Sequence, residues 1–536
     1  MLSLIHRRES FVGGDQDWFT NLTRMFQRLR RFQDQLARPR TNVSLLDYGT
    51  IRHTRGSDHR LLKRVPDAKP ASISAGGTYL IAKYMQNSRY MPWLGFLFVM
   101  GHMSLSHVRR QIIRSPSTVD ITGAQMVMVM KLSAFCWNVA DGQLSDELLS
   151  EFQRDRAIRE LPDFLDYAGY ILFFPSLFAG PAFDYAEYRR WLDTTMFKVS
   201  SDIDPSKKPF LRKRRKIPRS ATPAMFKAIA GLLWLALFVI FSAKYGHEQL
   251  LQESYVQYAL WRRVWIMYTV NLVARLKYYG VWTLTEGSCI LAGLGYNGVD
   301  PITGKVLWNR LQNVDPWAVE TAQNPRGYMA GWNMNTNSWL RNYVYLRVTP
   351  RGKKPGFRAS LTTFGTSAFW HGFYPGYYFT FILASLVQTA AKNLRRLVRP
   401  FFLDSVTGKP SPSKKYYDMA SLIFTQLTFS FATTPFLVLT FSDAVRAWSR
   451  VDFYGAVWTI ACLVFFASPG KTTLKAELEK RQGRVSEKLV RSASTDSLTG
   501  NQPMLGISKD LGRDVTEAME ELTAAEVETR QKKKSS

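Results

Sequence analysis

The stretch that decides the fold is residues 361–391, LTTFGTSAFWHGFYPGYYFTFILASLVQTAA, which contains no Asp, Glu, Lys or Arg. It is long enough to cross a bilayer, since a membrane helix needs about 20 predominantly apolar residues. His371 lies inside it. An ionisable side chain at membrane depth is costly unless it faces protein or a water-filled cavity, so it marks a candidate functional site. The alternative is a hydrogen-bonded histidine that packs between helices.

Long apolar runs recur through the middle of the chain, although its mean hydropathy of -0.16 is that of a soluble protein. The average is misleading because polar ends dilute the apolar middle, and hydropathy must be read in windows. The runs are too long and too continuously apolar for barrel strands, so the predicted fold is all-α, a polytopic transmembrane helical bundle. The predicted membrane segments are 80–103, 121–140, 164–183, 225–243, 258–273, 281–294, 361–391, 416–440 and 451–467.

Three regions follow from this pattern. Residues 1–69 form a basic, mostly polar arm without a secretory signal, 70–470 the transmembrane domain, and 471–536 a charged, cytosolic and largely disordered tail. The chain closes with Lys533, Lys534, Ser535 and Ser536. Two lysines at those positions resemble a retrieval signal recognised by coat proteins, which predicts an endoplasmic reticulum membrane protein. A merely basic chain end is the alternative.

The formal net charge of +29 is concentrated beside the apolar runs, at 206–219, 347–358 and 392–399. Basic loops next to membrane helices are typical of the cytosolic side. We therefore expect a lipid bilayer and a phosphorylated substrate as partners, and no nucleic acid. The three cysteines Cys136, Cys289 and Cys462 have no metal-ligand spacing, so we expect buried apolar thiols, no metal site and no bound cofactor.

A second polar feature precedes His371. Residues 331–345, GWNMNTNSWLRNYVY, bring four Asn and two Trp into one short segment. Buried amide groups are costly unless they bind one another, the backbone or a substrate. The segment is therefore a second part of the candidate site.

The pair formed by this Asn-rich segment and Trp370-His371-Gly372 resembles the membrane-bound O-acyltransferase family, and within it the lysophospholipid acyltransferases of fungi and animals. Further matching strings are GAQM at 123–126, FFPSLFAGP at 173–181, RLKYYGVWTLTEG at 275–287 and GLGYNG at 293–298. Each string alone is weak, whereas the combination, spread over residues 62–470, is specific. One departure is that the family begins with membrane helices where this chain has its basic arm, as in a variant or shortened amino end or a mistaken gene model.

The resemblance implies a helical bundle around a central reaction chamber and transfer of an acyl group from acyl-CoA, a cosubstrate, to the free hydroxyl of a lysophospholipid. The family's essential histidine falls on His371 and its asparagine on Asn333, which are 371 − 333 = 38 residues apart. Asn335 and Asn337 remain alternatives for the amide role. We expect the chain to fold back so that the two segments meet.

The chemical hypothesis is that His371 takes the proton of the acceptor hydroxyl while Asn333 orients the imidazole or stabilises the oxyanion. A covalent acyl-enzyme is disfavoured because no activated nucleophile is evident, and Ser367 is taken as a packing residue. Pro375-Gly376 predicts a break in the helix directly after the histidine.

Other candidate substrate-binding residues are Trp332 and Trp370 beside the two motifs, and the basic residues Arg347, Arg351, Lys353 and Lys354, which have the charge to meet the phosphates of coenzyme A. Ordinary basic flanking sequence is the favoured explanation of these basic residues, because every basic loop of the chain fits that rule. Glu286 is expected to pair with Arg275 or Lys277, and a place in the acceptor chamber is the less favoured alternative.

Two alternatives to an enzyme stay open at this stage. One is a proton-coupled membrane transporter, disfavoured because neither motif occurs twice. The other is a catalytically silent scaffold of the same fold. A sterol or diacylglycerol acyltransferase is disfavoured because the pattern Phe-Tyr-x-Asp-Trp-Trp-Asn is absent from the sequence.

Overall fold

The structure is a computed structural model that describes residues 68–113, 121–199, 201, 203–209, 217–349, 356–404 and 407–489. Arg351, Lys353 and Lys354 lie outside the described residues. So do most of the predicted amino-terminal arm and the predicted retrieval signal at 533–536.

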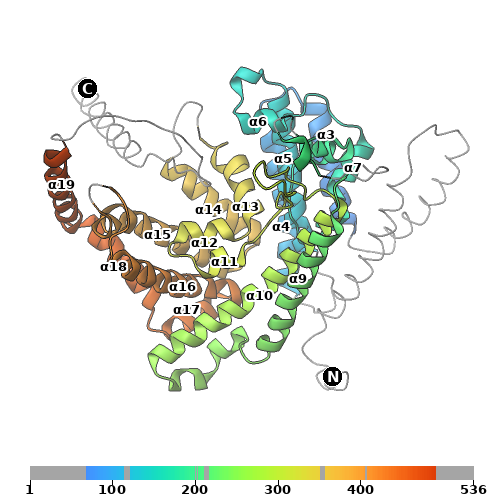
Figure 1. The fold of residues 1–536 in the computed structure, drawn as a ribbon. Helices are drawn as coiled ribbons and strands as arrows, with labels where there is room; N and C mark the ends of the chain where they lie inside the picture. Colours follow the sequence, from blue (N-terminus) through green and yellow to red (C-terminus); the bar gives the residue numbers. More distant parts are fainter. Residues whose placement is uncertain are drawn as a thin grey trace, which may run out of the picture.

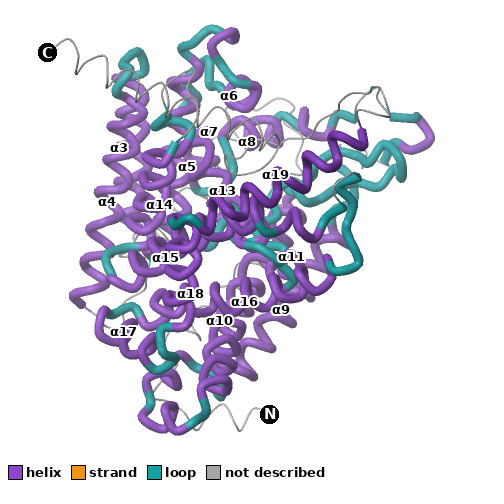
Figure 2. Tube along the Cα trace, turned by 90° about the vertical axis from the view of Figure 1, so that its left-hand side faces the viewer, coloured by secondary structure: helices purple, strands orange, loops and turns teal. Residues whose placement is uncertain are grey.

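Helices dominate the described residues, as Figure 2 shows, and β-structure is limited there to isolated bridges. The predicted all-α class is confirmed. The first group comprises α3 (Ala68–Met85), α4 (Met91–Ile113) and α5 (Thr122–Gly142), which pack against one another. Of the short helices that follow, α6 (Glu151–Arg156) and α7 (Phe164–Ile171) pack against α5, and α8 (Tyr185–Leu192) packs against both of them.

The helices α9 (Ala221–Ser242) and α10 (Leu260–Ala292) form a long antiparallel pair, drawn in green across the lower middle of Figure 1. Two glycines permit their close approach. A Cβ on Gly231 would lie 3.0 Å from Gly280 O, and one on Gly280 would lie 2.6 Å from Leu235 Cγ. Small residues allow helix backbones to approach closely inside membranes, where apolar packing replaces the hydrophobic effect.

The central helices are short. They are α11 (Pro316–Glu320), α12 (Pro325–Gly331), α13 (Met334–Leu340), the π-helical turn η8 (Arg341–Tyr345) and α14 (Phe357–His371). A last group follows, made of α15 (Pro375–Leu397), α16 (Lys414–Val438), α17 (Phe441–Ser449), α18 (Tyr454–Ala467) and α19 (Gly470–Leu489). In Figure 1 the central helices lie between α3–α5 on one side and α15–α18 on the other. Both candidate motifs belong to this central region.

Several predicted membrane segments were wrong in extent. The segment 80–103 is divided by a turn between α3 and α4, and 164–183 contains only α7 and a 3-10 turn. The segments 258–273 and 281–294 are one helix, α10. The segment 361–391 is split into α14 and α15, at the break that Pro375-Gly376 predicted.

By length and composition, two stretches among the described residues can cross a membrane, Ala221–Leu251 and Lys414–Val438. The bent pair α17 and α18, which meet at 82°, would add a third. This is fewer than the nine predicted segments because many of the others carry polar residues or are interrupted. In α5, for example, Gln125, Lys131 and Asn138 are all at most 2% exposed, so they face protein rather than lipid.

Two of the buried charges, Arg275 and Glu286, are paired across helices. Arg275 of α10 makes two hydrogen bonds of 2.8 Å to the Glu320 carboxylate. Glu286 lies 2.8 Å from Lys227 of α9. The predicted pairing of Glu286 was therefore right in kind but wrong in partner, because Arg275 is held by Glu320 and the nearest cation comes from the neighbouring helix. The three cysteines are buried free thiols, as predicted.

Candidate active site

His371 is the last residue of α14, and the chain turns at Gly372 before α15 begins at Pro375. Proline suits a first helical position because its missing N–H is not needed there. The half-buried imidazole packs among aromatic rings from α14, α15 and α16. The ring centroids lie 4.7 Å from Trp370, 5.7 Å from Tyr377, 5.2 Å from Phe381 and 4.9 Å from Phe436.

The start of α15 is fixed against the end of α16. Gly376 N donates to Leu439 O at 2.8 Å, and a Cβ on Gly376 would lie 2.0 Å from Pro435 O. Only glycine allows the two backbones to come this close. This contact holds two of the aromatic rings, Tyr377 and Phe436, beside the histidine.

Asn333 precedes α13 in a left-handed conformation, with φ 45° and ψ 54°. Asparagine tolerates this region better than most residues. Its Oδ1 accepts a hydrogen bond of 2.8 Å from Thr336 Oγ1. Within the described chain no group accepts a hydrogen bond from Asn333 Nδ2, so that amide nitrogen is available as a donor.

The neighbouring amides are used internally. Asn335 Nδ2 donates to Gln312 O at 3.2 Å and to Asn313 Oδ1 at 3.0 Å. Asn337 Nδ2 donates to Met329 O at 2.6 Å and to Trp332 O at 2.8 Å. These bonds shape the turn before α13, which favours Asn333 over both alternatives for a role in chemistry.

One face of α5 holds both motifs. Trp370 Nε1 donates to Met126 O at 3.0 Å, and Thr336 Oγ1, which also binds Asn333, lies 3.3 Å from Met130 Sδ. Four residues of α-helix rise by about 6 Å. The Asn-rich segment and the Trp-His-Gly segment therefore contact successive turns of the same helix, although no direct hydrogen bond joins Asn333 to His371 among the described residues.

The contacts extend further along α5. Trp339 Nε1 donates to Ser133 Oγ at 2.9 Å, and the Trp339 ring lies 6.1 Å from the Trp370 ring. Trp332 instead packs on α10, with its ring 5.0 Å from that of Trp282. Both predicted tryptophans thus have packing partners, and their contact with substrate remains a prediction.

Arg347 has an internal partner. Its guanidinium donates two hydrogen bonds to the Asp141 carboxylate, at 2.7 and 2.5 Å, and lies 4.4 Å from the Trp137 ring. The Asp141 side chain is 2% exposed. This bidentate pair fixes the end of η8 against the end of α5, so the contacts favour a structural role for Arg347.

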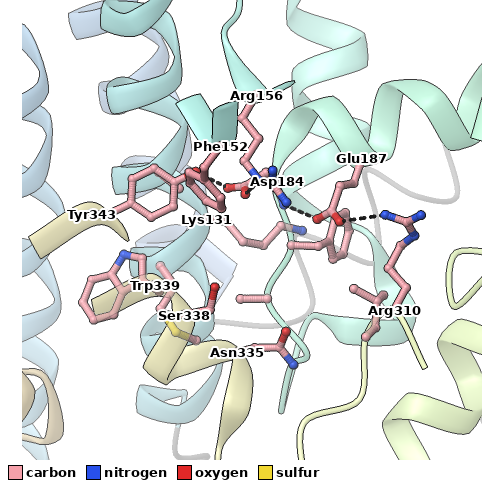
Figure 3. A pocket seen from close by; sticks show the side chains of 15 residues that line it. Lys131, Phe152, Arg156, Asp184, Glu187, Arg310, Asn335, Ser338, Trp339 and Tyr343 are labelled. Carbon is pink, nitrogen blue, oxygen red and sulfur yellow. Dashed lines mark hydrogen bonds and ion pairs between the residues drawn. The ribbon is translucent and has the colours of Figure 1, made fainter. Parts of the chain in front are cut away.

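Sequence reasoning missed a polar cavity of about 130 Å³ between α5, α6, α8 and α13, shown in Figure 3. Its basic members are Lys131, Arg156 and Arg310. Its carboxylates are Asp184, 2.7 Å from Arg156 Nε, and Glu187, 3.4 Å from Arg310 Nη1. The wall on the α13 side contains Asn335, Ser338 and Trp339, so the cavity adjoins the Asn-rich segment.

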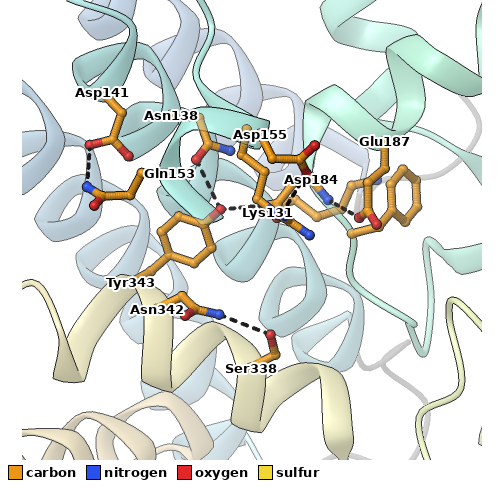
Figure 4. Close-up of polar contacts among 12 residues, drawn as sticks. Lys131, Asn138, Asp141, Gln153, Asp155, Asp184, Glu187, Ser338, Asn342 and Tyr343 are labelled. Carbon is orange, nitrogen blue, oxygen red and sulfur yellow. Dashed lines mark hydrogen bonds and ion pairs between the residues drawn. The ribbon is translucent and has the colours of Figure 1, made fainter. Parts of the chain in front are cut away.

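Hydrogen bonds keep this cavity in shape, as Figure 4 shows. Tyr343 OH lies 2.8 Å from Asp184 Oδ1 and 3.0 Å from Asn138 Oδ1. The sequence signal was the change from the apolar string ending at Phe183 to Asp184 and Glu187. This signal indicates a cavity only once the packing of α6 and α8 beside α5 is known. Among the described residues no group of His, Cys, Asp and Glu has the arrangement of a metal site.

Comparison with known proteins gives concordant matches. The model of the membrane-bound O-acyltransferase family matches residues 113–434. The lysophospholipid acyltransferase of Schizosaccharomyces pombe is 41% identical over 80% of this chain and 82% of its own length. That of Saccharomyces cerevisiae is 42% identical over 76% of this chain and 67% of its own length. The human membrane-bound glycerophospholipid O-acyltransferase 1 is 30% identical over 69% of this chain and 73% of its own.

The conformation of Gly372, with φ 118° and ψ −163°, generates a first prediction. This region is essentially restricted to glycine, and other residues are strained there by about 1–3 kcal/mol. Gly372→Ala should lower turnover at least about 10-fold, because it displaces the neighbouring imidazole. The measurement is turnover together with thermal stability in detergent. The matched control is Gly365→Ala within α14, where an added Cβ meets nothing within 4 Å. Equal turnover of the two variants would contradict the prediction.

Proposed function

The chain belongs to the membrane-bound O-acyltransferase family, and from this we propose that it transfers an acyl group from acyl-CoA to the free hydroxyl of a lysophospholipid. The observation that carries the assignment of the site is the convergence of the Asn-rich segment and the Trp-His-Gly segment on one face of α5. The relatives' names support the acceptor, and the thioester donor is our inference from the reaction class.

The proposed reaction is direct. The hydroxyl oxygen of the acceptor attacks the thioester carbonyl while His371 takes its proton. The carbon–sulfur bond then breaks, and the coenzyme A thiolate takes the proton back from the imidazolium as it leaves. Asn333 is proposed to donate from Nδ2 to the oxyanion, or to orient the imidazole by accepting from its N–H at Oδ1. The aromatic rings around His371 exclude water, which would otherwise hydrolyse the donor.

An acyl-enzyme intermediate is not needed. Ser367, one turn before His371 on α14, is buried. Cys136 and Cys289, the two fully buried thiols, lie in the apolar core formed by α4, α5 and their neighbours. Among the described residues no histidine is hydrogen-bonded to any of these three side chains, whereas a covalent route requires a nucleophile beside a base.

The polar cavity offers a place for the polar part of the donor. Lys131, Arg156 and Arg310 bring three basic groups beside the Asn-rich segment, and phosphates bind arginine strongly. The cavity lies toward the end of α5 that also holds Arg347, whose following loop is the basic segment predicted to be cytosolic. We propose that coenzyme A phosphates bind at this cavity, with Lys353 and Lys354, which follow Arg347 in the sequence, as further candidates.

The proposed location is the endoplasmic reticulum membrane, with the carboxyl-terminal tail in the cytosol. Multiple apolar helices support a membrane protein. The basic loops and the chain end Lys533-Lys534-Ser535-Ser536, a proposed coat-protein ligand, support the compartment and the orientation.

The test of the function is to express the chain in membranes that lack their own acyltransferases and to measure transfer of labelled acyl groups to a panel of lysophospholipids. His371→Ala and Asn333→Ala should each lower turnover by about 100-fold or more, the usual loss for a general base or an oxyanion donor. His247→Ala, at a histidine whose side chain is 47% exposed, is the control. Near-normal turnover of His371→Ala would reject the assignment, and no product from the wild-type chain would favour a silent scaffold.

The proposed donor site has its own test. Arg310→Gln should raise the KM for acyl-CoA several-fold, because one phosphate partner is lost, and should leave the KM for acyl-pantetheine, which lacks the phosphates, unchanged. The control is Arg189→Gln on α8, whose guanidinium pairs with Asp166 and Asp193 outside the cavity. An equal rise in KM for both donors would show that Arg310 is structural.

A further inference from the structure

We infer that His107 is a positioning residue for the acyl transfer: its ring holds the backbone on both sides of His371 and thereby sets the direction of that imidazole. His107 belongs to α4 and lies 263 residues from Trp370 in the sequence. The inference rests on the proposed function, since it assigns the proton transfer to His371. It adds a second histidine that nothing in the two sequence motifs indicates.

The first contact is with the residue before His371. His107 Nε2 lies 3.2 Å from Trp370 O, and the His107 residue is 4% exposed. Because a carbonyl oxygen only accepts, Nε2 carries the proton and donates it to this bond. Trp370 O belongs to the last turn of α14, where carbonyls lack helical N–H partners. His107 therefore caps the carboxyl end of the helix that carries His371.

The second contact is with the residue after His371. A Cβ on Gly372 would lie 3.0 Å from His107 Nδ1 and 3.2 Å from its Cγ. The imidazole of His107 thus packs against the Gly372 backbone in space that any side chain would fill. The glycine of the Trp-His-Gly motif serves both the unusual backbone turn and the close approach of this second histidine.

Together these contacts fix the residues on both sides of His371. Trp370 is held by its carbonyl to α4, through His107, and by its indole Nε1 to α5, at Met126 O. The His371 side chain begins from a backbone that is fixed at the preceding and the following residue. Its ring is then confined by aromatic neighbours such as Phe381 and Phe436. The direction of the imidazole therefore depends on His107 through the backbone.

His107 is not placed to be the base itself. Its Nε2 is already engaged with a backbone carbonyl, and a proton held in that bond is unavailable for exchange with substrate. A positioning role makes a specific demand, which is a donor at the location of Nε2. A role in helix packing alone makes no such demand. A second histidine of α4 allows a comparison.

That comparison residue is His102, five residues earlier on α4. Its Nδ1 lies 2.7 Å from Ser74 Oγ of α3, so it forms a hydrogen bond between helices in the same way but away from α14. His102→Leu removes an imidazole and a hydrogen bond from the same helix. It is therefore a matched control for His107→Leu.

The experiment compares wild type, His107→Leu, His107→Gln and His102→Leu, purified in detergent, by kcat, by the KM for each substrate and by thermal stability. His107→Leu should lower kcat about 10- to 100-fold with both KM values within about twofold, because small misplacements of a catalytic group cost this much. His107→Gln should recover most of kcat, since its amide can donate to Trp370 O. His102→Leu should retain kcat.

Unchanged kcat in His107→Leu would overturn the inference. Equal losses of kcat in His107→Leu and His102→Leu, in proportion to their losses of thermal stability, would also overturn it. A readout that needs no activity separates this inference from the proposed function: the rate at which diethyl pyrocarbonate modifies His371, followed by mass spectrometry. The modification rate of His371 should change at least about twofold in His107→Leu, because its imidazole is redirected. It should return to the wild-type rate in His107→Gln. An unchanged rate would overturn the inference even if the wild-type chain transferred no acyl group.

Discussion

The constraint on which the site depends is that one face of α5 must receive two segments that are distant in the sequence. Met126 and Met130 lie one turn apart on that face, and they contact Trp370 and Thr336 respectively. Ser133, further along, binds Trp339. Few polar atoms of α5 face lipid, since its polar residues are buried in protein. The helix acts as a common support on which the Asn-rich turn and the end of α14 are set at a fixed spacing.

A second constraint concerns backbone geometry around His371. The helix must stop at the histidine, and the next one must begin almost at once. Gly372 makes the turn with a conformation available essentially to glycine, and Gly376 lets α15 meet the end of α16 within hydrogen-bond distance. An apolar stretch that seemed long enough for one membrane span is thereby used as two helices with His371 at their junction. The cost of breaking a helix at this depth is reduced because its last carbonyls find partners such as His107.

Part of this was predictable from the sequence. Long apolar runs gave the all-α class, and the Pro375-Gly376 pair gave the break after His371. The density of asparagine marked the second half of the site. The sequence did not reveal which asparagine has a free donor, because that depends on Gln312 and Asn313 from a preceding loop. Nor did it reveal the polar cavity or His107, since both arise from helices that meet only in the folded chain. Membrane segments were misplaced where buried charges such as Arg275 interrupt an apolar pattern without interrupting the helix.

The central claim is that Asn333 and His371, whose segments contact successive turns of α5, act as one unit. A double-mutant cycle tests it: kcat is measured for Asn333→Ala, His371→Ala and the double variant, with equal thermal stability as a condition for comparison. Residues that act as a unit are strongly non-additive, so the double variant should be about as slow as the slower single variant. A double variant whose loss equals the product of the two single losses would show that the two side chains act independently, and would contradict the assembly of one site on α5.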